Sequence, residues 1–237
     1  MTYAIFLIAM SKTSSNLYQT KTEKFEIGGL FMSPYESLPE YEWKNKTIEL
    51  VKKYPLSTDT IIETVLEAWD GILKTKIADE LQIGVDIFPS PQILGNYLHE
   101  LIPVILEKKY PGSWSRDLEK KDKDLVYIPD PQYSAEIKTS SNPNNIFGNA
   151  SYGQEDSANA SSKSKDGYYL AVNFEKFNPK ASSFSPRIKK IRFGWLDHSD
   201  WHSQSASSGQ AATISPAVRD NKLLLIYDSS RGGKIAF

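Results

Sequence analysis

Apolar positions recur at helical spacing in two stretches of the first half of the chain. The stretch "STDTIIETVLEAWDGILKTKIADEL" (57–81) carries them at intervals of three and four, and its first three residues are N-cap candidates. The stretch "SPQILGNYLHELIPVILEKKYPG" (90–112) begins with a cap residue followed by proline, which is typical of a helix start, and ends at Pro-Gly. The pattern therefore predicts that residues 57–110 are mainly helical, with a kink at Pro103.

Residues 1–55 lack this periodicity and are rich in Tyr, Ser and Pro, so we expect an irregular segment that wraps the domain. Their apolar run "YAIFLIAM" (3–10) is far shorter than the ~20 residues of a membrane-spanning helix. No basic residue precedes the run and no clear cleavage site follows it. We therefore expect a strand here, with neither a signal peptide nor a membrane association.

The period changes in the second half of the chain, where short segments rich in β-branched and aromatic residues predict strands. Two long polar stretches, 141–167 and 198–221, separate some of these segments, and loops of that length are usually functional or disordered. Residues 1–237 are therefore expected to form one α/β domain, in which α-helices flank a central mixed β-sheet and residues 122–237 hold the sheet with its loops. The expected strands are "DLVYIP" (124–129), "YSAEIKTS" (133–140), "YYLAVNFEKF" (168–177), "KIRFGWLD" (190–197) and "KLLLIYD" (222–228).

Composition excludes several kinds of chemistry. A chain of 237 residues with 40% hydrophobic residues can bury one substantial core. The absence of cysteine excludes disulfides, thiolate catalysis and Cys-based zinc sites, and it suits a reducing cytoplasm. A net charge of −1 gives no overall signal for a nucleic-acid partner, although it is compatible with a local basic cleft.

The stretch "SAEIKTSS" (134–141) places an acid and a base two positions apart in an expected strand. Side chains at i and i+2 share one face of a strand, so Glu136 and Lys138 stand side by side while Ile137 points away. Other (D/E)-x-K matches occur in the chain, but only this one follows a strand that begins with an acid. The pair is either an exposed ion pair or half of an active site.

Two aspartates are candidates for the other half. If residues 129–131 form the turn, Asp124 lies opposite Glu136 and shares its face with Lys138. Asp130 then sits at the tip, roughly 20 Å from Glu136 along an extended strand, and is better explained as a turn residue. A two-residue turn would reverse the faces, so Asp130 remains the alternative.

An Asp, a Glu and a Lys on one face of a hairpin suit phosphodiester hydrolysis. Carboxylates hold Mg²⁺, which takes oxygen ligands, polarises the phosphate and lowers the pKa of an attacking water. A neighbouring lysine can orient that water or neutralise charge on the phosphate. Together with "SAEIKTSSNPNNIFGNASYGQ", "GYYLAVNFEKF" and "IRFGWLDHSDW", the arrangement resembles the PD-(D/E)XK motif of the ScaI-like group of type II restriction endonucleases, over about residues 92–202.

This resemblance implies a restriction-endonuclease-like α/β core, Mg²⁺-dependent cleavage of double-stranded DNA, and a homodimer that recognises a palindrome. It makes Asp124 and Glu136 the metal ligands and Lys138 the catalytic lysine. Such nucleases often add a helical glutamate ahead of the hairpin, and Glu100 matches that place better than Glu63 or Glu67. The sequence departs from the motif at residue 123, where Lys replaces the usual Pro.

The polar stretch after the catalytic strand contains the expected DNA contacts. Asn and Gln can bond adenine in a bidentate way, whereas Ser more often contacts phosphates. The alternatives are a disordered Asn/Ser-rich loop and, for the basic residues, a solvated strand edge. The candidates are Ser140, Ser141, Asn142, Asn144, Asn145, Asn149, Ser151, Tyr152, Gln154, Lys190, Arg192 and His202.

Two other functions remain compatible with the sequence. A repair or junction-resolving nuclease of the same fold would cut without sequence specificity, but it would not need two long loops rich in Asn, Ser and Gln. A non-catalytic DNA-binding protein would use Glu136 and Lys138 only as an exposed ion pair.

Overall fold

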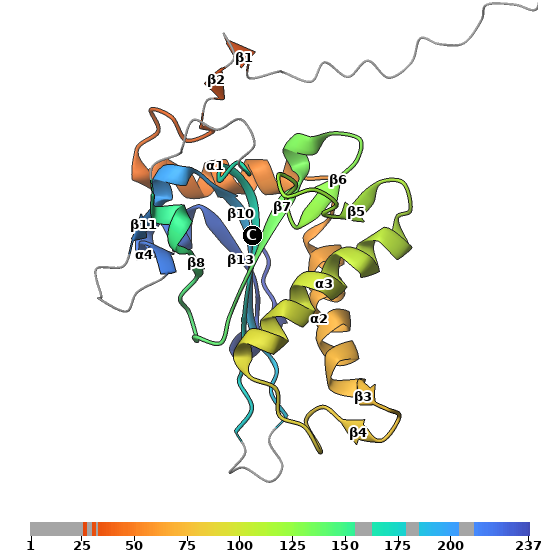
Figure 1. Ribbon diagram of the computed structural model, residues 1–237. Coiled ribbons are helices and arrows are strands. Elements are labelled where there is room, and N and C mark those ends of the chain that lie inside the picture. The colour runs from red at the N-terminus through yellow and green to blue at the C-terminus, as the bar shows by residue number, and fades with distance from the viewer. Residues whose placement is uncertain (1–25, 28–29, 32, 155–162, 179–184, 204–210) are drawn as a thin grey trace, which may run out of the picture. The chain divides into compact units, whose positions relative to one another are not determined.

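The computed structural model describes residues 26–27, 30–31, 33–154, 163–178, 185–203 and 211–237 (Figure 1). The chain divides into two compact units, residues 1–32 and 33–237. In the first unit, β1 (Glu26–Ile27) pairs antiparallel with β2 (Leu30–Phe31). The apolar run expected as a strand at 3–10 lies outside the described residues. No helix in the described part of the chain is long and apolar enough to cross a membrane.

A seven-stranded mixed sheet forms the centre of the second unit. Its strand order is β14-β13-β10-β9-β7-β6-β5, with β7 and β9 parallel and every other neighbouring pair antiparallel. The five expected strands are all present, so the predicted mixed sheet is confirmed. The bounds are β5 (Trp114–Arg116), β6 (Leu125–Tyr127), β7 (Ala135–Ser140), β9 (Gly167–Phe174), β10 (Ile188–Leu196), β13 (Leu223–Asp228) and β14 (Gly233–Lys234).

The two predicted helices are α2 (Thr58–Lys74) and α3 (Pro91–Lys109). Ser57 caps α2, because its hydroxyl accepts a hydrogen bond from the Thr60 backbone N–H at 3.1 Å. A short hairpin of β3 (Lys76–Ile77) and β4 (Leu81–Gln82) connects the two helices. The apolar stripes of both helices pack on one face of the sheet, as the sequence pattern predicted.

The expectation of an irregular segment up to residue 55 is wrong for α1 (Glu40–Lys53). This helix is largely polar, and only Thr47 and Val51 are buried, so it has no broad apolar stripe to reveal it. Acidic residues in its first turn and lysines in its last turn complement the helix dipole. A tertiary contact also stabilises this helix: the buried Thr47 hydroxyl donates a hydrogen bond to the Asn221 carbonyl at 2.6 Å.

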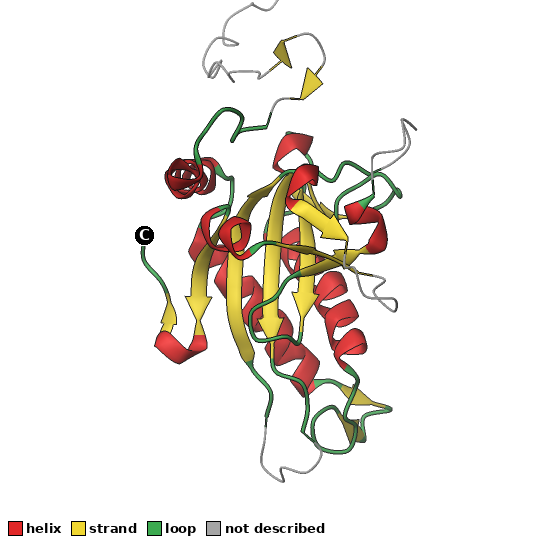
Figure 2. Cartoon of the chain, turned by 90° about the vertical axis from the view of Figure 1, so that its left-hand side faces the viewer, coloured by secondary structure: helices red, strands yellow, loops and turns green. Residues whose placement is uncertain are grey.

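Side chains of the central strands alternate between two apolar cores. On β9, Tyr168, Leu170 and Val172 face the helices, whereas Tyr169 and Ala171 face the other side, where a second core lies. Figure 2 shows the strands of the main sheet with the helices packed behind them. Because β9 is covered on both faces, all eight of its residues are buried.

A three-stranded sheet, β11-β12-β8, covers the second core. It is built from β8 (Phe147–Asn149), β11 (Trp201–Ser203) and β12 (Ala211–Ile214), followed by the short helix α4 (Pro216–Asn221). These elements come from the two polar stretches that were expected to be loops, so that expectation is corrected for the described parts of both. Trp201, Ile214 and Val218 supply the buried apolar side chains that anchor the small sheet.

Candidate active site

The hairpin of β6 and β7 has the register that the sequence predicted. Leu125 pairs with Ala135, so Asp124, one residue earlier, reaches the position opposite Glu136. Leu125 and Ala135 belong to the core under the helices, and the alternation of a strand then directs Asp124 and Glu136 to the opposite face. The Asp124 Oδ2 atom accepts a hydrogen bond from the Ile137 backbone N–H at 2.7 Å, which fixes the aspartate against the neighbouring strand.

The connection between the two strands is longer than the expected tight turn and contains a 3₁₀ helix, Pro131–Tyr133. Asp130 caps this helix, because its carboxylate accepts hydrogen bonds from the backbone and side-chain nitrogens of Gln132 at 3.1 and 2.7 Å. This is the local role expected of an aspartate in a turn. Asp130 is not among the residues that line the cleft described below.

Four charged side chains meet on this face of the sheet. The Lys138 Nζ atom lies 3.1 Å from Glu136 Oε2. The Nζ atom of Lys163, which precedes β9, lies 2.8 Å from Asp124 Oδ1 and 2.8 Å from Glu136 Oε1. Glu136 is 1% exposed and depends on these partners, because an unpaired buried carboxylate would be costly. Sequence reasoning did not identify Lys163, since nothing in the local sequence relates it to a carboxylate 39 residues earlier.

Tyr152 contacts both members of the Glu136–Lys138 pair. Its hydroxyl donates to Glu136 Oε2 at 3.1 Å, and its ring lies 4.5 Å from the Lys138 ammonium. The side chain is buried and its ring also packs edge-on against Trp201 of the small sheet. Tyr152 therefore holds Glu136 and Lys138 in place from the wall of the cleft, and its contact with DNA stays a prediction.

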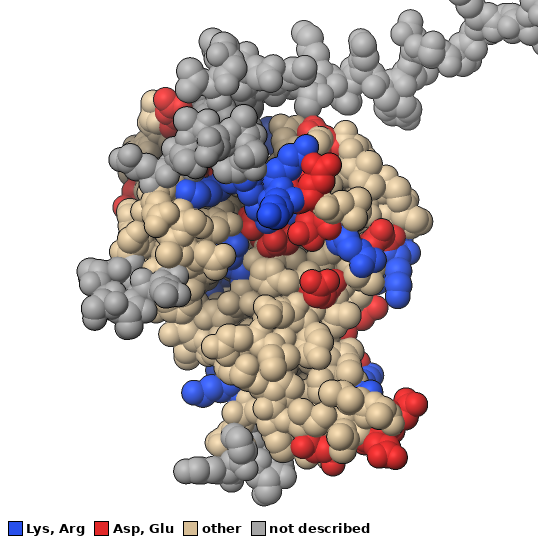
Figure 3. Space-filling model, in the orientation of Figure 1, with Lys and Arg blue, Asp and Glu red and all other residues tan. Residues whose placement is uncertain are grey.

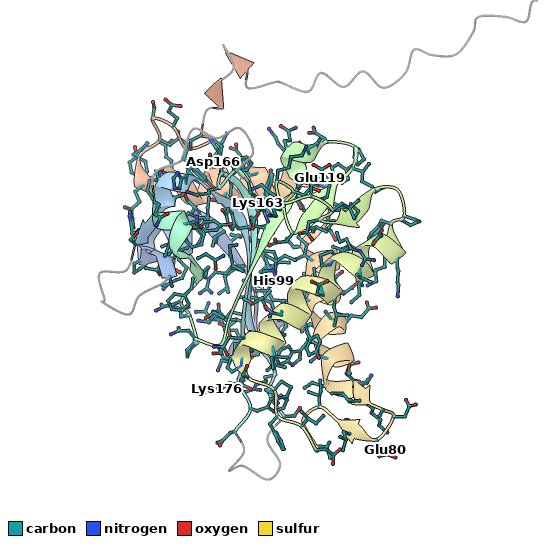
Figure 4. All side chains as sticks on the ribbon, in the orientation of Figure 1. Glu80, His99, Glu119, Lys163, Asp166 and Lys176 are labelled. Atoms are coloured by element: carbon teal, nitrogen blue, oxygen red, sulfur yellow. The ribbon has the colours of Figure 1, made fainter. Side chains whose placement is uncertain are left out.

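Charge and burial oppose each other at Asp124. Burial alone would raise the pKa of its carboxyl, but a hydrogen bond from His99 and the positive charges of Lys138 and Lys163 hold that pKa well below its usual range. The His99 Nδ1 atom lies 3.5 Å from Asp124 Oδ2. Figure 4 labels His99 on α3 and Lys163 in the segment before β9.

Lys123 and Lys138 respond to the same cluster in opposite directions. Burial lowers the pKa of Lys123 to about 8, and the charges of Lys163 and Lys138 add to this effect while Glu136 opposes it. For Lys138 burial is also the largest single cause and acts to lower the pKa, but Glu136, Tyr152 and Asp124 together outweigh it and raise the pKa above its ordinary value. The cluster therefore stabilises an ammonium at Lys138.

The cluster forms the wall of an open cleft of about 1350 Å³ between α3, β7 and the small sheet. Gly95 lets α3 approach β7 closely here, since a Cβ on it would lie 2.6 Å from the Thr139 hydroxyl. In Figure 3, acidic and basic side chains adjoin in the upper centre of the face shown, above a largely uncharged surface. The predicted site residues that line the cleft are Asp124, Glu136, Lys138, Glu100, Ser140, Ser141, Asn149, Ser151, Tyr152 and Gln154.

The predicted helical glutamate is exposed on α3 and does not join the acid pair. Among the described residues, no group of three or more His, Cys, Asp or Glu side chains is close enough to hold one metal ion. Glu100 lines the cleft, whereas α2 carries Glu63 and Glu67 on its exposed surface, and Glu67 pairs with Lys109. The neighbour of Glu100 in sequence, His99, is the α3 residue that reaches Asp124.

Several predicted DNA contacts instead build the loop that follows β7. Arg192, 3% exposed, donates to the side-chain oxygens of Asn173 and Asn144, and Lys190 donates to the same Asn144 oxygen. The Asn173 amide donates in turn to the carbonyls of Asn142 and Asn145. Arg192 is therefore a buried support of this loop, so the alternative of a solvated strand edge is wrong for it, and its contact with DNA stays a prediction.

Two other predicted DNA contacts, Asn142 and His202, do not line the cleft. The Asn142 side chain accepts hydrogen bonds from the backbone N–H groups of Asn144 and Asn145 at 3.0 and 2.8 Å, which closes a tight turn. His202 is exposed on β11, outside the residues that line the cleft. The chain from 142 to 154 thus contains a side-chain-capped turn, β8 and the 3₁₀ helix Ala150–Gly153.

The chemistry of the acid pair fits a hard divalent cation. Asp124 and Glu136 offer only oxygen donors, and the Lys163 ammonium already bridges one oxygen of each, which shows that a single cation can contact both carboxylates. Magnesium is commonly held by one or two carboxylates, with waters and substrate phosphates as the remaining ligands. The site therefore suits Mg²⁺ better than a metal that requires a closed set of protein ligands.

A mixed sheet flanked by helices, with an acid pair and a lysine at the edge of an open cleft, defines a restriction-endonuclease-like protein. A model of the ScaI restriction endonuclease family matches residues 33–227. The type II restriction enzyme ScaI of Streptomyces caespitosus is 44% identical over 195 residues, which cover 82% of this chain and 85% of that enzyme. No solved structure matches the chain significantly. The chain belongs to the ScaI restriction endonuclease family.

Proposed function

We propose that this type II restriction endonuclease cleaves double-stranded DNA at a specific sequence with Mg²⁺ held by Asp124 and Glu136. The observation that carries the proposal is the convergence of these two carboxylates and Lys138 on the wall of an open cleft. Family membership favours sequence-specific cleavage over both alternatives, the non-specific repair or junction-resolving nuclease and the non-catalytic DNA-binding protein.

Each side chain of the cluster has its own role in the proposed reaction. Mg²⁺ bound by the acid pair would polarise the scissile phosphate and activate the attacking water. Lys138, an ammonium at neutral pH, is placed to donate to the phosphate and to offset the negative charge that builds on it. Tyr152 fixes this lysine through its ring and Glu136 through its hydroxyl. Because all of these groups lie on or against β7, they are preorganised before DNA enters.

Recognition is assigned to the exposed polar residues of the cleft. Asn149 and Gln154 carry amides that can bond base edges, while Ser141 and Ser151 suit phosphate oxygens. Asn149 ends β8 of the small sheet, Ser151 and Gln154 lie in and directly after the 3₁₀ helix that follows it, and Ser141 directly follows β7. All four line the cleft together with the acid pair. Glu100, on the opposite wall, is assigned a polar contact to the DNA or to waters around the metal.

A homodimer in the cytoplasm is the proposed working form. A palindromic DNA site is matched most economically by a two-fold dimer. Large exposed apolar side chains of the described residues concentrate around the β3–β4 hairpin and the start of α3, which supports this region as the contact between copies. They are Ile77, Leu81, Val85, Phe88, Ile93 and Tyr97. Sedimentation should show about twice 26.7 kDa when DNA is present; a strict monomer on DNA would contradict the proposal.

Digestion of a sequenced plasmid tests the proposed chemistry. With Mg²⁺ we expect discrete fragments whose ends map to one sequence. With Ca²⁺ in its place we expect specific binding without cutting, because the acid pair binds either ion but the larger Ca²⁺ has a different coordination geometry. Equal cutting in EDTA would exclude the metal-dependent mechanism, and a smear in Mg²⁺ would exclude sequence specificity.

A further inference from the structure

The charged end of Lys163 lies between the carboxylates of Asp124 and Glu136. Its ammonium lies 2.8 Å from one oxygen of Asp124 and 2.8 Å from one oxygen of Glu136, and so it sits between the two proposed metal ligands. Lys138, by contrast, contacts the other oxygen of Glu136, on its own strand. The two lysines therefore hold separate positions, and only Lys163 fills the gap between the acids.

We infer that Lys163 is a resident cation that occupies the metal position when no metal is bound and leaves it when a divalent ion enters. This inference rests on the proposed function, in which Asp124 and Glu136 are the metal ligands. The ammonium and a divalent ion cannot share the gap, because both would contact the same two oxygens and would repel each other at close range.

The position of Lys163 in the fold permits such an exchange. Its backbone belongs to neither a helix nor a strand, and its side chain is 25% exposed to the cleft, whereas Glu136 is 1% exposed on a central strand. Asp124, 18% exposed, is held by a hydrogen bond from the Ile137 backbone N–H, and Lys163 is the most exposed of the three charged groups. A long, flexible lysine stem can move its charged end without moving the backbone.

Charge balance gives the exchange a consequence for DNA binding. With Lys163 in place, the charges of two acids and two lysines cancel within the cluster. A divalent ion that displaces Lys163 leaves an excess of two positive charges in the cleft, and DNA phosphates supply the matching negative charge. Metal binding should therefore be weak without DNA and much tighter with it, and Lys163 should be a main cause of that difference.

Calcium binding followed by isothermal titration calorimetry tests the inference without any cleavage. Lys163→Met, which removes the charge and keeps an unbranched side chain of similar size, should lower the Ca²⁺ dissociation constant roughly tenfold, since metal entry no longer breaks these ion pairs. DNA should then tighten Ca²⁺ binding by a smaller factor in Lys163→Met than in the wild type. Thermal melting without metal should show a lower midpoint for the variant, and Ca²⁺ should raise it more than in the wild type.

Two control variants separate the possible failures. Lys165→Met removes the same charge from the same cleft, but Lys165 donates to the Gln154 carbonyl at 3.1 Å, so its Ca²⁺ affinity should stay near wild type. An equal gain in both lysine variants would overturn the exchange in favour of a general field effect, and no gain in Lys163→Met would overturn it outright. Asp124→Asn should lose Ca²⁺ binding; if it binds Ca²⁺ like the wild type, the proposed metal site itself is wrong.

Discussion

Two clusters among the described residues each bring a pair of carboxylates into contact with a lysine, and the clusters differ in their access to solvent. In the cluster described above, Asp124 and Glu136 form one wall of the cleft, and the cation between them has a route to solvent. In the second cluster, Lys222 lies 2.9 Å from Asp197 and 2.8 Å from Asp200, and all three residues are buried. We refer to them as the open cluster and the closed cluster.

Neutral side chains surround the charged atoms of the closed cluster. Its Asp197 carboxylate accepts hydrogen bonds from Ser33 and from the Trp195 indole, at 2.7 and 3.0 Å. The rings of Tyr35 and Trp43 cover the Lys222 ammonium at 4.4 and 4.8 Å. These donors and rings leave no place for a further ion or a substrate oxygen. The closed cluster therefore joins the end of β10 to the start of β13 and to the N-terminal part of the second unit.

The difference shows that burial of charge does not by itself identify an active site. Glu136 is as deeply buried as any residue of the closed cluster. What distinguishes the open cluster is that its acids are balanced mainly by cations, one of which stands at the cleft. A cation held this way can be exchanged for a metal, whereas hydrogen bonds from Trp195 and Ser33 cannot. We therefore expect substitutions in the open cluster to reduce cleavage and substitutions in the closed cluster to reduce stability.

The largest expected effect is on catalysis. Asp124→Asn keeps the size of the side chain and an oxygen for the Ile137 N–H, but removes charge from the proposed metal site. Cleavage in Mg²⁺ should fall by about three orders of magnitude or more, because several kcal/mol of transition-state stabilisation are lost. The rate is measured on a plasmid with one site. Asp200→Asn, the matched change in the closed cluster, should leave the rate of the folded protein within a few-fold; equal losses would refute the comparison.

The next effect is on stability. Lys222→Met leaves Asp197 and Asp200 without their cation and should lower the free energy of unfolding by about 3–5 kcal/mol, measured in urea at neutral pH. Burial already raises the pKa of Asp200, although Lys222 opposes this shift, so in the variant that pKa rises further. A carboxyl whose folded-state pKa exceeds the unfolded one destabilises the fold above that pKa. The deficit should therefore shrink as the pH falls, and a pH-independent deficit would argue against unpaired carboxylates.

Local sequence predicted Asp124, Glu136 and Lys138 of the open cluster. The alternation of β7 places Glu136 and Lys138 together, and the register of the hairpin adds Asp124, because both depend on residues close in sequence. Lys163 and His99 reach the acids from a distant segment and from α3, across distances in the chain that no period describes. The alternation along a strand predicts on which face of the sheet each side chain lies, but it cannot predict which loop packs against that face.

The helices and strands also divide into those that local sequence predicted and those that it did not. Helices α2 and α3 have caps and continuous apolar stripes, so sequence alone predicted them. The small sheet was missed because its strands are only three or four residues long, and because β8 pairs with β12 across more than 60 residues of chain, as between Gly148 and Ala212. Helix α1 was missed because it is polar, and tertiary contacts at Trp43 and Thr47 contribute to its stability.

The smallest expected effect concerns Asp130, the other aspartate that the sequence offered. Its carboxylate caps a 3₁₀ helix in the connection between β6 and β7, and asparagine can accept the same hydrogen bond from the Gln132 N–H. Asp130→Asn should therefore change the cleavage rate by no more than a few-fold and the stability by about 0.5 kcal/mol or less. Both are measured under the conditions used for Asp124→Asn. An inactive Asp130→Asn beside an active Asp124→Asn would move the acid of the open cluster to the turn, and the contrast with the closed cluster would then rest on Glu136 alone.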